Sequence, residues 1–181
     1  YVECSAAGMK YRLIPVTDEI IRCMIAKDEV KTEQESLIIE KKEYPQVPFE
    51  AAEADGVVTV KTSAVQAELN LKTGGITWKH ADGSVWLEQN KADLTRIDVV
   101  HYNTGGEKPI INRVKTVDGE RNFIQNLKAE KVRDGYRARV FFDWKEDEEI
   151  HGLGQAEEGI YNYREHTQYL YQHNMRIPMP M

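Results

Sequence analysis

The chain has 181 residues, with 24 Lys plus Arg, 30 Asp plus Glu and a formal net charge of -6. This length is enough for one domain with a single hydrophobic core. No basic block is present that could follow a phosphate backbone, so nucleic acid is not expected as a partner. Apolar runs extend over a few residues, whereas a membrane-crossing helix needs roughly 20, so no membrane partner is expected.

The first part of the chain is predicted to form short strands. Lys10 to Leu13 and Ile20 to Ile25 are expected as strands joined by "PVTDE", and Leu37 to Glu40 as another. The stretch "EKKEYPQVPFEAAEADG" carries Pro45 and Pro48 and few apolar residues, which indicates a surface connection.

The cysteines Cys4 and Cys23 lie in this first part, without a CxxC motif or clustered histidines. This argues against a zinc site and a dense disulfide framework, and no cofactor is expected. We predict free, buried thiols, with a disulfide as the alternative if the protein is exported. The chain begins at Tyr1 without a signal-peptide pattern, which we interpret as a cut. The sequence does not assign a cellular compartment, and a periplasmic or secreted location is among the alternatives.

The region after Gly56 alternates apolar and polar residues with a period of two, which is typical of half-buried strands. The inward-facing set is Val58, Val60, Val65, Ala67, Leu69 and Leu71. Turns are expected at Gly74-Gly75 and at Asp82-Gly83, before Val85-Trp86-Leu87. Three strands in a meander are therefore predicted here.

The second half contains two further features. The segment from Asn103 to Glu120, with Gly105-Gly106 and Pro109, is predicted to be a long loop or hairpin. A strand through Val132 is then expected to turn tightly at Asp134-Gly135 and to return as a second strand. One face of the returning strand would carry Tyr136, Ala138, Val140, Phe142 and Trp144. Regularly spaced strands without intervening helices predict an all-β fold, an antiparallel β-sandwich with large sheets.

Several candidate chemistries are weak. The acidic run from Asp143 to Glu149 is interpreted as a solvated turn. Glycosidic cleavage, the reaction that paired carboxylates would suggest, needs two of them held roughly 5 to 10 Å apart on opposite sides of a sugar, and consecutive acids on a turn do not meet this requirement. His166 and His173 have no third metal ligand at suitable spacing. The glycines of "GLGQAEEG" precede no helix and stand beside two acids, so they indicate turns rather than a phosphate site.

Asn162, Tyr163 and Arg164 are the strongest candidates for binding, with Tyr161 and Tyr169 nearby. Aromatic rings offer apolar platforms for the C-H faces of a sugar, while the amide and the guanidinium offer hydrogen bonds to its hydroxyls. The alternative is a strand edge at which Arg and Tyr lie along the surface.

The same terminal stretch resembles a known family. "IHGLGQAEEGIYNYR" followed by "LYQHNMRIPMPM" is similar to the end of the N-terminal domain of glycoside hydrolase family 31, the α-glucosidase and α-xylosidase family. Members carry a Y/F-G-L-G-[EQ] segment, an Asn-rich loop and a strand with an "iPf" core; His151 stands where an aromatic is usual. Upstream, "DEIIRCMI", "AELNLKTGGITW" and "DGSVWLEQ" resemble earlier strands of that domain. The short "GIYNYR" loop is most similar to bacterial members of the α-xylosidase or related type.

The resemblance implies a galactose-mutarotase-like β-sandwich packed on a (β/α)8 barrel, whose aspartates serve as nucleophile and acid/base of a retaining mechanism. Residues 1–181 would then be a domain fragment without the barrel and without catalytic residues. Asn162, Tyr163 and Arg164, with Glu165 beside them, would form a substrate-site loop for an α-glucoside or α-xyloside. Two alternatives stay open: an autonomous carbohydrate-binding module, and a mutarotase-type epimerase, for which no His and carboxylate pair is located.

Overall fold

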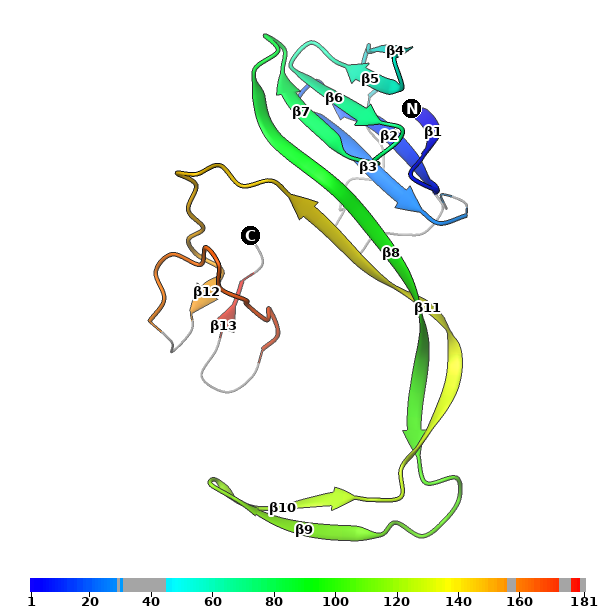
Figure 1. The fold of residues 1–181 in the computed structure, drawn as a ribbon, viewed down its shortest axis with the longest axis vertical. Helices are drawn as coiled ribbons and strands as arrows, with labels where there is room; N and C mark the ends of the chain where they lie inside the picture. Colours follow the sequence, from blue (N-terminus) through cyan, green and yellow to red (C-terminus); the bar gives the residue numbers. More distant parts are fainter. Residues whose placement is uncertain (29, 31–44, 156–158, 173–176, 180–181) are drawn as a thin grey trace. The chain divides into compact units, whose positions relative to one another are not determined.

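The computed structural model describes residues 1–28, 30, 45–155, 159–172 and 177–179. They form two compact units, Tyr1–Phe142 and Asp143–Met181 (Figure 1). Every strand pairing is antiparallel and the described residues contain no helix, so the all-β prediction is confirmed. No helix in the described part of the chain is long and apolar enough to span a membrane. The expectation of a single domain over 1–181 stays a prediction.

A three-stranded sheet opens the first unit, in the order β1-β2-β3. Its strands are β1 (Val2–Ala6), β2 (Met9–Thr17) and β3 (Ile20–Ala26). The two predicted strands lie within β2 and β3 and are confirmed, although most of "PVTDE" belongs to β2 rather than to a connection. The predicted strand Leu37 to Glu40 lies outside the described residues.

A six-stranded sheet has the order β11-β8-β7-β6-β5-β4. Its strands are β4 (Glu50–Ala54), β5 (Val57–Lys61), β6 (Val65–Asn70), β7 (Ile76–His80), β8 (Val85–Asn103) and β11 (Lys128–Phe142). The predicted meander is confirmed. The predicted surface connection is wrong over β4, which pairs with β5 at the sheet edge. Every residue of β4 is exposed. The strand is formed by backbone pairing without burial of side chains, so its sequence has no alternating apolar pattern that could have predicted it.

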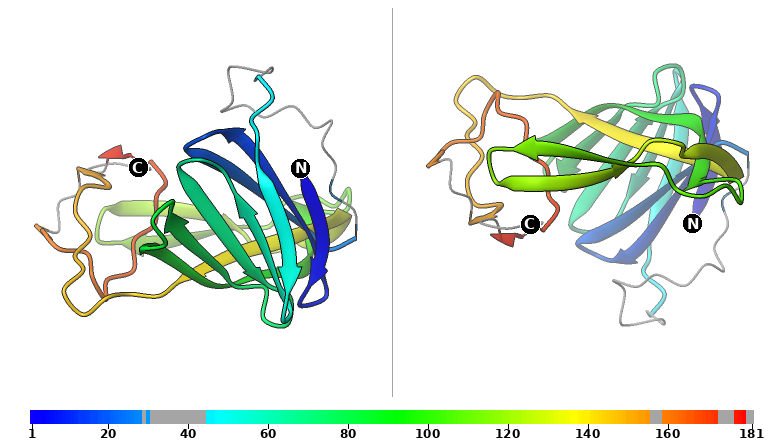
Figure 2. Two further views of the ribbon diagram at one scale, coloured as in Figure 1. Left: turned by 90° about the horizontal axis from the view of Figure 1, so that it is seen from above. Right: turned by 90° about the horizontal axis from the view of Figure 1, so that it is seen from below.

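The two sheets face each other and bury one core, as expected for a sandwich (Figure 2). The small sheet contributes Ala6, Met9, Tyr11, Leu13 and Ile21, and the large sheet contributes Val58, Val60, Ala67, Leu69 and Ile76. Tyr11, Leu13 and Leu69 are fully buried. The period-two alternation after Gly56 therefore identified the core face of β5 and β6 correctly.

Polar groups also join the sheets. The Tyr11 hydroxyl donates to the Gly74 carbonyl at 3.1 Å, and a Cβ at Gly74, whose φ is +73°, would lie 2.5 Å from that hydroxyl. Thr62, which is buried, donates its hydroxyl to the Asp18 carbonyl at 2.5 Å and accepts from the Val65 amide at 3.1 Å. Each side chain thus fixes a turn of one sheet against the other.

The predicted turn at Asp134-Gly135 is wrong, because β11 continues through it and pairs with β8. Gly135 lies opposite Ile97, and a Cβ there would lie 2.7 Å from Val99 Cγ2. Glycine therefore makes room for a cross-strand side chain instead of allowing a reversal. The apolar face expected for this strand is largely open, since Tyr136, Val140 and Phe142 are all exposed.

A separate hairpin follows the end of β8. It consists of β9 (Ile111–Thr116) and β10 (Gly119–Ile124), preceded by a loop. The prediction of a loop or hairpin from Asn103 to Glu120 is confirmed, with the hairpin extending a few residues further. In the second unit, β12 (Gly154–Gln155) pairs with β13 (Ile177–Pro178).

Candidate functional site

The Asn162 side chain organises the loop that the sequence singled out. Its Oδ1 accepts from the Ile150 amide at 3.2 Å and from the Arg164 amide at 3.0 Å. The Tyr163 amide donates in turn to the Ile150 carbonyl at 2.8 Å. Asparagine suits this position because its short amide can accept from backbone N-H groups two residues ahead and across a loop.

Arg164 closes the same loop from the other side. Its Nη1 donates to the carbonyls of Lys145 and Glu148, at 2.8 Å and 2.6 Å. Its guanidinium carbon lies 5.5 Å from the ring centroid of Trp144, within the range of a cation–π contact. The structure thus holds the predicted residues together, but the side chains of Asn162 and Arg164 both make hydrogen bonds to backbone groups of this unit.

The aromatic residues of this unit differ in exposure. Tyr163 is buried, whereas Tyr161, Tyr169 and Tyr171 are exposed, Tyr161 by 82%. The rings of Tyr169 and Tyr171 meet edge-on with centroids 6.4 Å apart. Platforms for an apolar ligand face are therefore offered by Tyr161, Tyr169 and Tyr171, while Tyr163 packs inward. A substrate-binding role for Asn162 to Arg164 stays a prediction.

His151 is bonded through both ring nitrogens. Nε2 lies 2.8 Å from Glu149 Oε2, Nδ1 lies 2.9 Å from the Tyr161 carbonyl, and the imidazole centroid is 4.5 Å from the Tyr161 ring. The pKa of His151 is raised, first by the hydrogen bond to Glu149 and second by the one to the Tyr161 carbonyl. Only the imidazolium donates to both acceptors at once.

The acidic turn is exposed from Asp143 to Glu149. Within it the Glu148 carboxylate accepts from the Lys145 amide at 3.1 Å, and the Glu148 amide donates to the Lys145 carbonyl at 3.2 Å. These bonds fit the interpretation of a solvated turn held by its own side chains. Among the described residues, no three His, Cys, Asp or Glu side chains are grouped as metal ligands would be.

Cys4 and Cys23 are free thiols, as predicted, and both are partly buried against the core. Burial raises the pKa of Cys23 to about 12, with a smaller contribution from Cys4. Burial is also the main cause of the raised pKa of Cys4. Neither thiol therefore has the thiolate character of a nucleophile.

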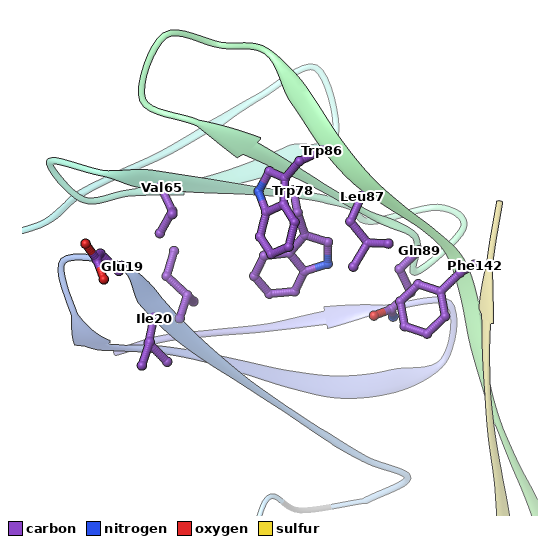
Figure 3. A pocket seen from close by; sticks show the side chains of 9 residues that line it. Glu19, Ile20, Val65, Trp78, Trp86, Leu87, Gln89 and Phe142 are labelled. Carbon is purple, nitrogen blue, oxygen red and sulfur yellow. The ribbon is translucent and has the colours of Figure 1, made fainter. Parts of the chain in front are cut away.

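A pocket that the sequence did not predict lies in the first unit, with a volume of about 360 Å³ (Figure 3). Its lining includes Trp78, Trp86, Gln89 and Phe142 from the large sheet and Ile20 from the small one. A sequence signal existed, because the two tryptophans flank the Asp82-Gly83 turn. The two tryptophans meet at the pocket because the register between β7 and β8 shifts, and this shift cannot be predicted from the sequence.

No protein-family model matches the chain. A solved structure, the GH31 alpha-xylosidase from Xanthomonas citri, matches over 99% of this chain with a TM-score of 0.65 and 20% sequence identity. This chain shares the fold of that part of a GH31 alpha-xylosidase. The match covers 16% of the alpha-xylosidase chain, so this chain spans about one sixth of that protein's length. The β-sandwich expected from the family resemblance is therefore confirmed as a fold.

Proposed function

We propose that the chain is the N-terminal β-sandwich of a retaining α-glycosidase of family 31, of the α-glucosidase or α-xylosidase type, and that it supports a catalytic barrel. The observation that carries the proposal is the structural match over 99% of this chain to a small part of an alpha-xylosidase. The ordered motifs from "DEIIRCMI" to "LYQHNMRIPMPM" support it independently.

In this proposal the chemistry belongs to the barrel. Retaining cleavage needs two carboxyl groups about 5 Å apart, one as nucleophile and one as acid and then base. Two acids of the turn that Arg164 contacts are engaged locally, since Glu148 accepts from the Lys145 amide and Glu149 from His151. In this proposal the domain alone is catalytically silent.

The loop from Asn162 to Arg164 forms part of the wall of the substrate site. Asn162 sets the backbone shape, while Arg164 uses Nη1 for the turn carbonyls. A guanidinium carries donors on three nitrogens, and the hydrogen bonds of Arg164 to the described residues use Nη1, so Nε and Nη2 would serve the hydroxyls of an α-glucoside or α-xyloside.

Hydrolysis of aryl α-glucosides and aryl α-xylosides by the full-length protein and by residues 1–181 tests the proposal. We expect turnover by the full-length protein and none by residues 1–181. Turnover by residues 1–181 alone would contradict the proposal, and so would a full-length protein inactive on both substrate classes.

A variant test addresses the loop. Arg164→Lys in the full-length protein should raise KM for the active substrate, because Lys lacks the planar fork of donors. Arg121→Lys, on the exposed strand β10, is the matched control and should leave KM unchanged. Equal KM values for the two variants would contradict a role of the loop in the substrate site.

The second candidate function is an autonomous carbohydrate-binding module. The observation that favours it is the exposure of Tyr161, Tyr169 and Tyr171 in the terminal unit. Titration of residues 1–181 and of their Tyr169→Ala variant with gluco- and xylo-oligosaccharides, followed by tyrosine and tryptophan fluorescence, distinguishes the two. No saturable change up to millimolar oligosaccharide, or a change that Tyr169→Ala leaves unaltered, would contradict the binding module and favour the scaffold role.

A further inference from the structure

The pocket of the first unit combines aromatic walls with one buried amide. Trp78, Trp86 and Phe142 line it together with Gln89, and the exposed residue Glu19 lies at the end opposite Gln89 (Figure 3). Its volume of about 360 Å³ is within the range of small-molecule sites, roughly 300 to 1,000 Å³. None of the predicted loop residues Asn162 to Arg164 belongs to it.

A β-bulge brings both sides of β8 to the pocket. Consecutive residues of a regular strand point to opposite faces, yet Trp86 and Leu87 both line it. The register between β7 and β8 shifts here, from Trp78 opposite Leu87 to Lys79 opposite Val85, which leaves Trp86 as the extra residue. Such bulges re-aim side chains and are frequent beside binding sites.

Gln89 supplies a buried polar group without a partner. The residue is 7% exposed, and its Nε2 makes no hydrogen bond within the described structure. Gln89 pairs across the sheet with Ile76 on one side and Phe142 on the other, so apolar neighbours flank it. An unpaired buried amide destabilises the folded chain, and a ligand oxygen that accepts from this amide would remove that cost.

The occupant must satisfy both features. A purely aromatic or aliphatic ligand would cover the indoles but would leave Gln89 Nε2 unpaired. A pyranose ring has an apolar C-H face for an indole and hydroxyl oxygens that accept from an amide. We propose that this pocket binds a pyranoside, with its C-H face on the tryptophans and one hydroxyl oxygen accepting from Gln89.

This site goes beyond the proposed function, because its lining residues all belong to the first unit and none to the loop from Asn162 to Arg164. Titration with methyl α-D-glucopyranoside and methyl α-D-xylopyranoside tests it, with tryptophan fluorescence as the readout. Two of the protein's three tryptophans line the pocket, so a saturable change is expected. D-Mannitol, an open-chain polyol, should give none. No saturable change with either pyranoside up to 100 mM, about the weakest useful affinity, would overturn the proposal.

Variants locate the site. Trp86→Ala should weaken binding by about tenfold or more through the lost stacking. Gln89→Met keeps the side-chain length but removes the amide, and should weaken binding about five- to tenfold. Trp144→Ala is the matched control, because Trp86 and Trp144 are each 47% exposed, and it should leave the affinity unchanged. Circular dichroism establishes that each variant is folded.

Three outcomes contradict the assignment. Binding lost in Trp144→Ala but kept in Trp86→Ala would place the sugar at the terminal unit. Affinity unchanged in Gln89→Met would remove the amide from recognition. Cyclohexanol binding as tightly as the pyranosides would indicate an apolar pocket instead. Enzymatic activity does not enter these readouts, so failure of the proposed function would leave them unaffected.

Discussion

The sandwich of the first unit and the terminal unit are stabilised by different interactions. The sandwich buries Tyr11, Leu13 and Leu69 completely between two sheets. The terminal unit is held by polar side chains that bond to backbone, through Asn162 and Arg164. Burial of apolar area contributes much of the free energy of folding and does not depend on the direction of the contacts. Each hydrogen bond contributes little to that free energy and depends on its geometry. The candidate site lies in the region whose shape depends on single polar residues.

The largest effect is expected from the sandwich core. Leu69→Ala should lower the free energy of unfolding by about 2–5 kcal/mol, because Leu69 is fully buried and its removal leaves a cavity. Leu170→Ala is the matched control in the terminal unit, where Leu170 is 48% exposed, and should change it by less than about 0.5 kcal/mol. Urea denaturation of both variants measures the difference. Equal costs would remove the distinction between the two units.

A smaller effect is expected from the polar tie between the sheets. Thr62→Val keeps the shape but removes the hydroxyl that donates to Asp18 and accepts from Val65. The free energy of unfolding should fall by about 1–3 kcal/mol, since these groups lose a partner in a buried position. Thr59→Val, in strand β5 just before Thr62, is the control, and its free energy of unfolding should stay near the wild-type value. Urea denaturation again measures both, and a neutral Thr62→Val would contradict the assigned role.

The sequence predicted the part of the fold that follows a period of two. Val58, Val60 and Leu69 alternate with polar residues, and all three are buried. The same reasoning failed at Asp134-Gly135, where the partner strand decides whether a glycine turns the chain or admits the Val99 side chain. Local turn chemistry cannot report a neighbour that lies distant in sequence.

The candidate site was predicted in composition but not in contacts. Asn162 and Arg164 were singled out for ligand binding, and the structure brings them together around the backbone of Lys145 to Ile150. The pocket with Trp86 and Gln89 was missed, since a bulge and an unpaired amide are products of strand pairing. Both results have one cause. The sequence shows which chemical groups a side chain carries, whereas the groups that it contacts are determined by the fold.

A local effect is expected from the loop. Asn162→Ala should speed hydrogen exchange of the Ile150 and Arg164 amides by about five- to tenfold, because each loses the Oδ1 acceptor. Amides of the sandwich core, such as Leu69, should keep their exchange rates. Thr167→Ala, an exposed position in the same loop, is the control. Acceleration throughout the sandwich would show that the two units open together.

The smallest effect concerns pH, and it is again confined to the terminal unit. Because the pKa of His151 is raised in the folded state by Glu149 and the Tyr161 carbonyl, protonation favours the folded loop. This contribution is complete below the ordinary value of 6.5 and is lost as pH rises through the folded-state pKa. NMR titration of the His151 ring should show the raised pKa, and Glu149→Gln should lower it. Glu148→Gln, whose parent carboxylate bonds the Lys145 amide, is the control. Equal shifts in both variants would assign the effect to general acidity of the turn, whereas a shift in Glu149→Gln alone would assign it to the single hydrogen bond at 2.8 Å.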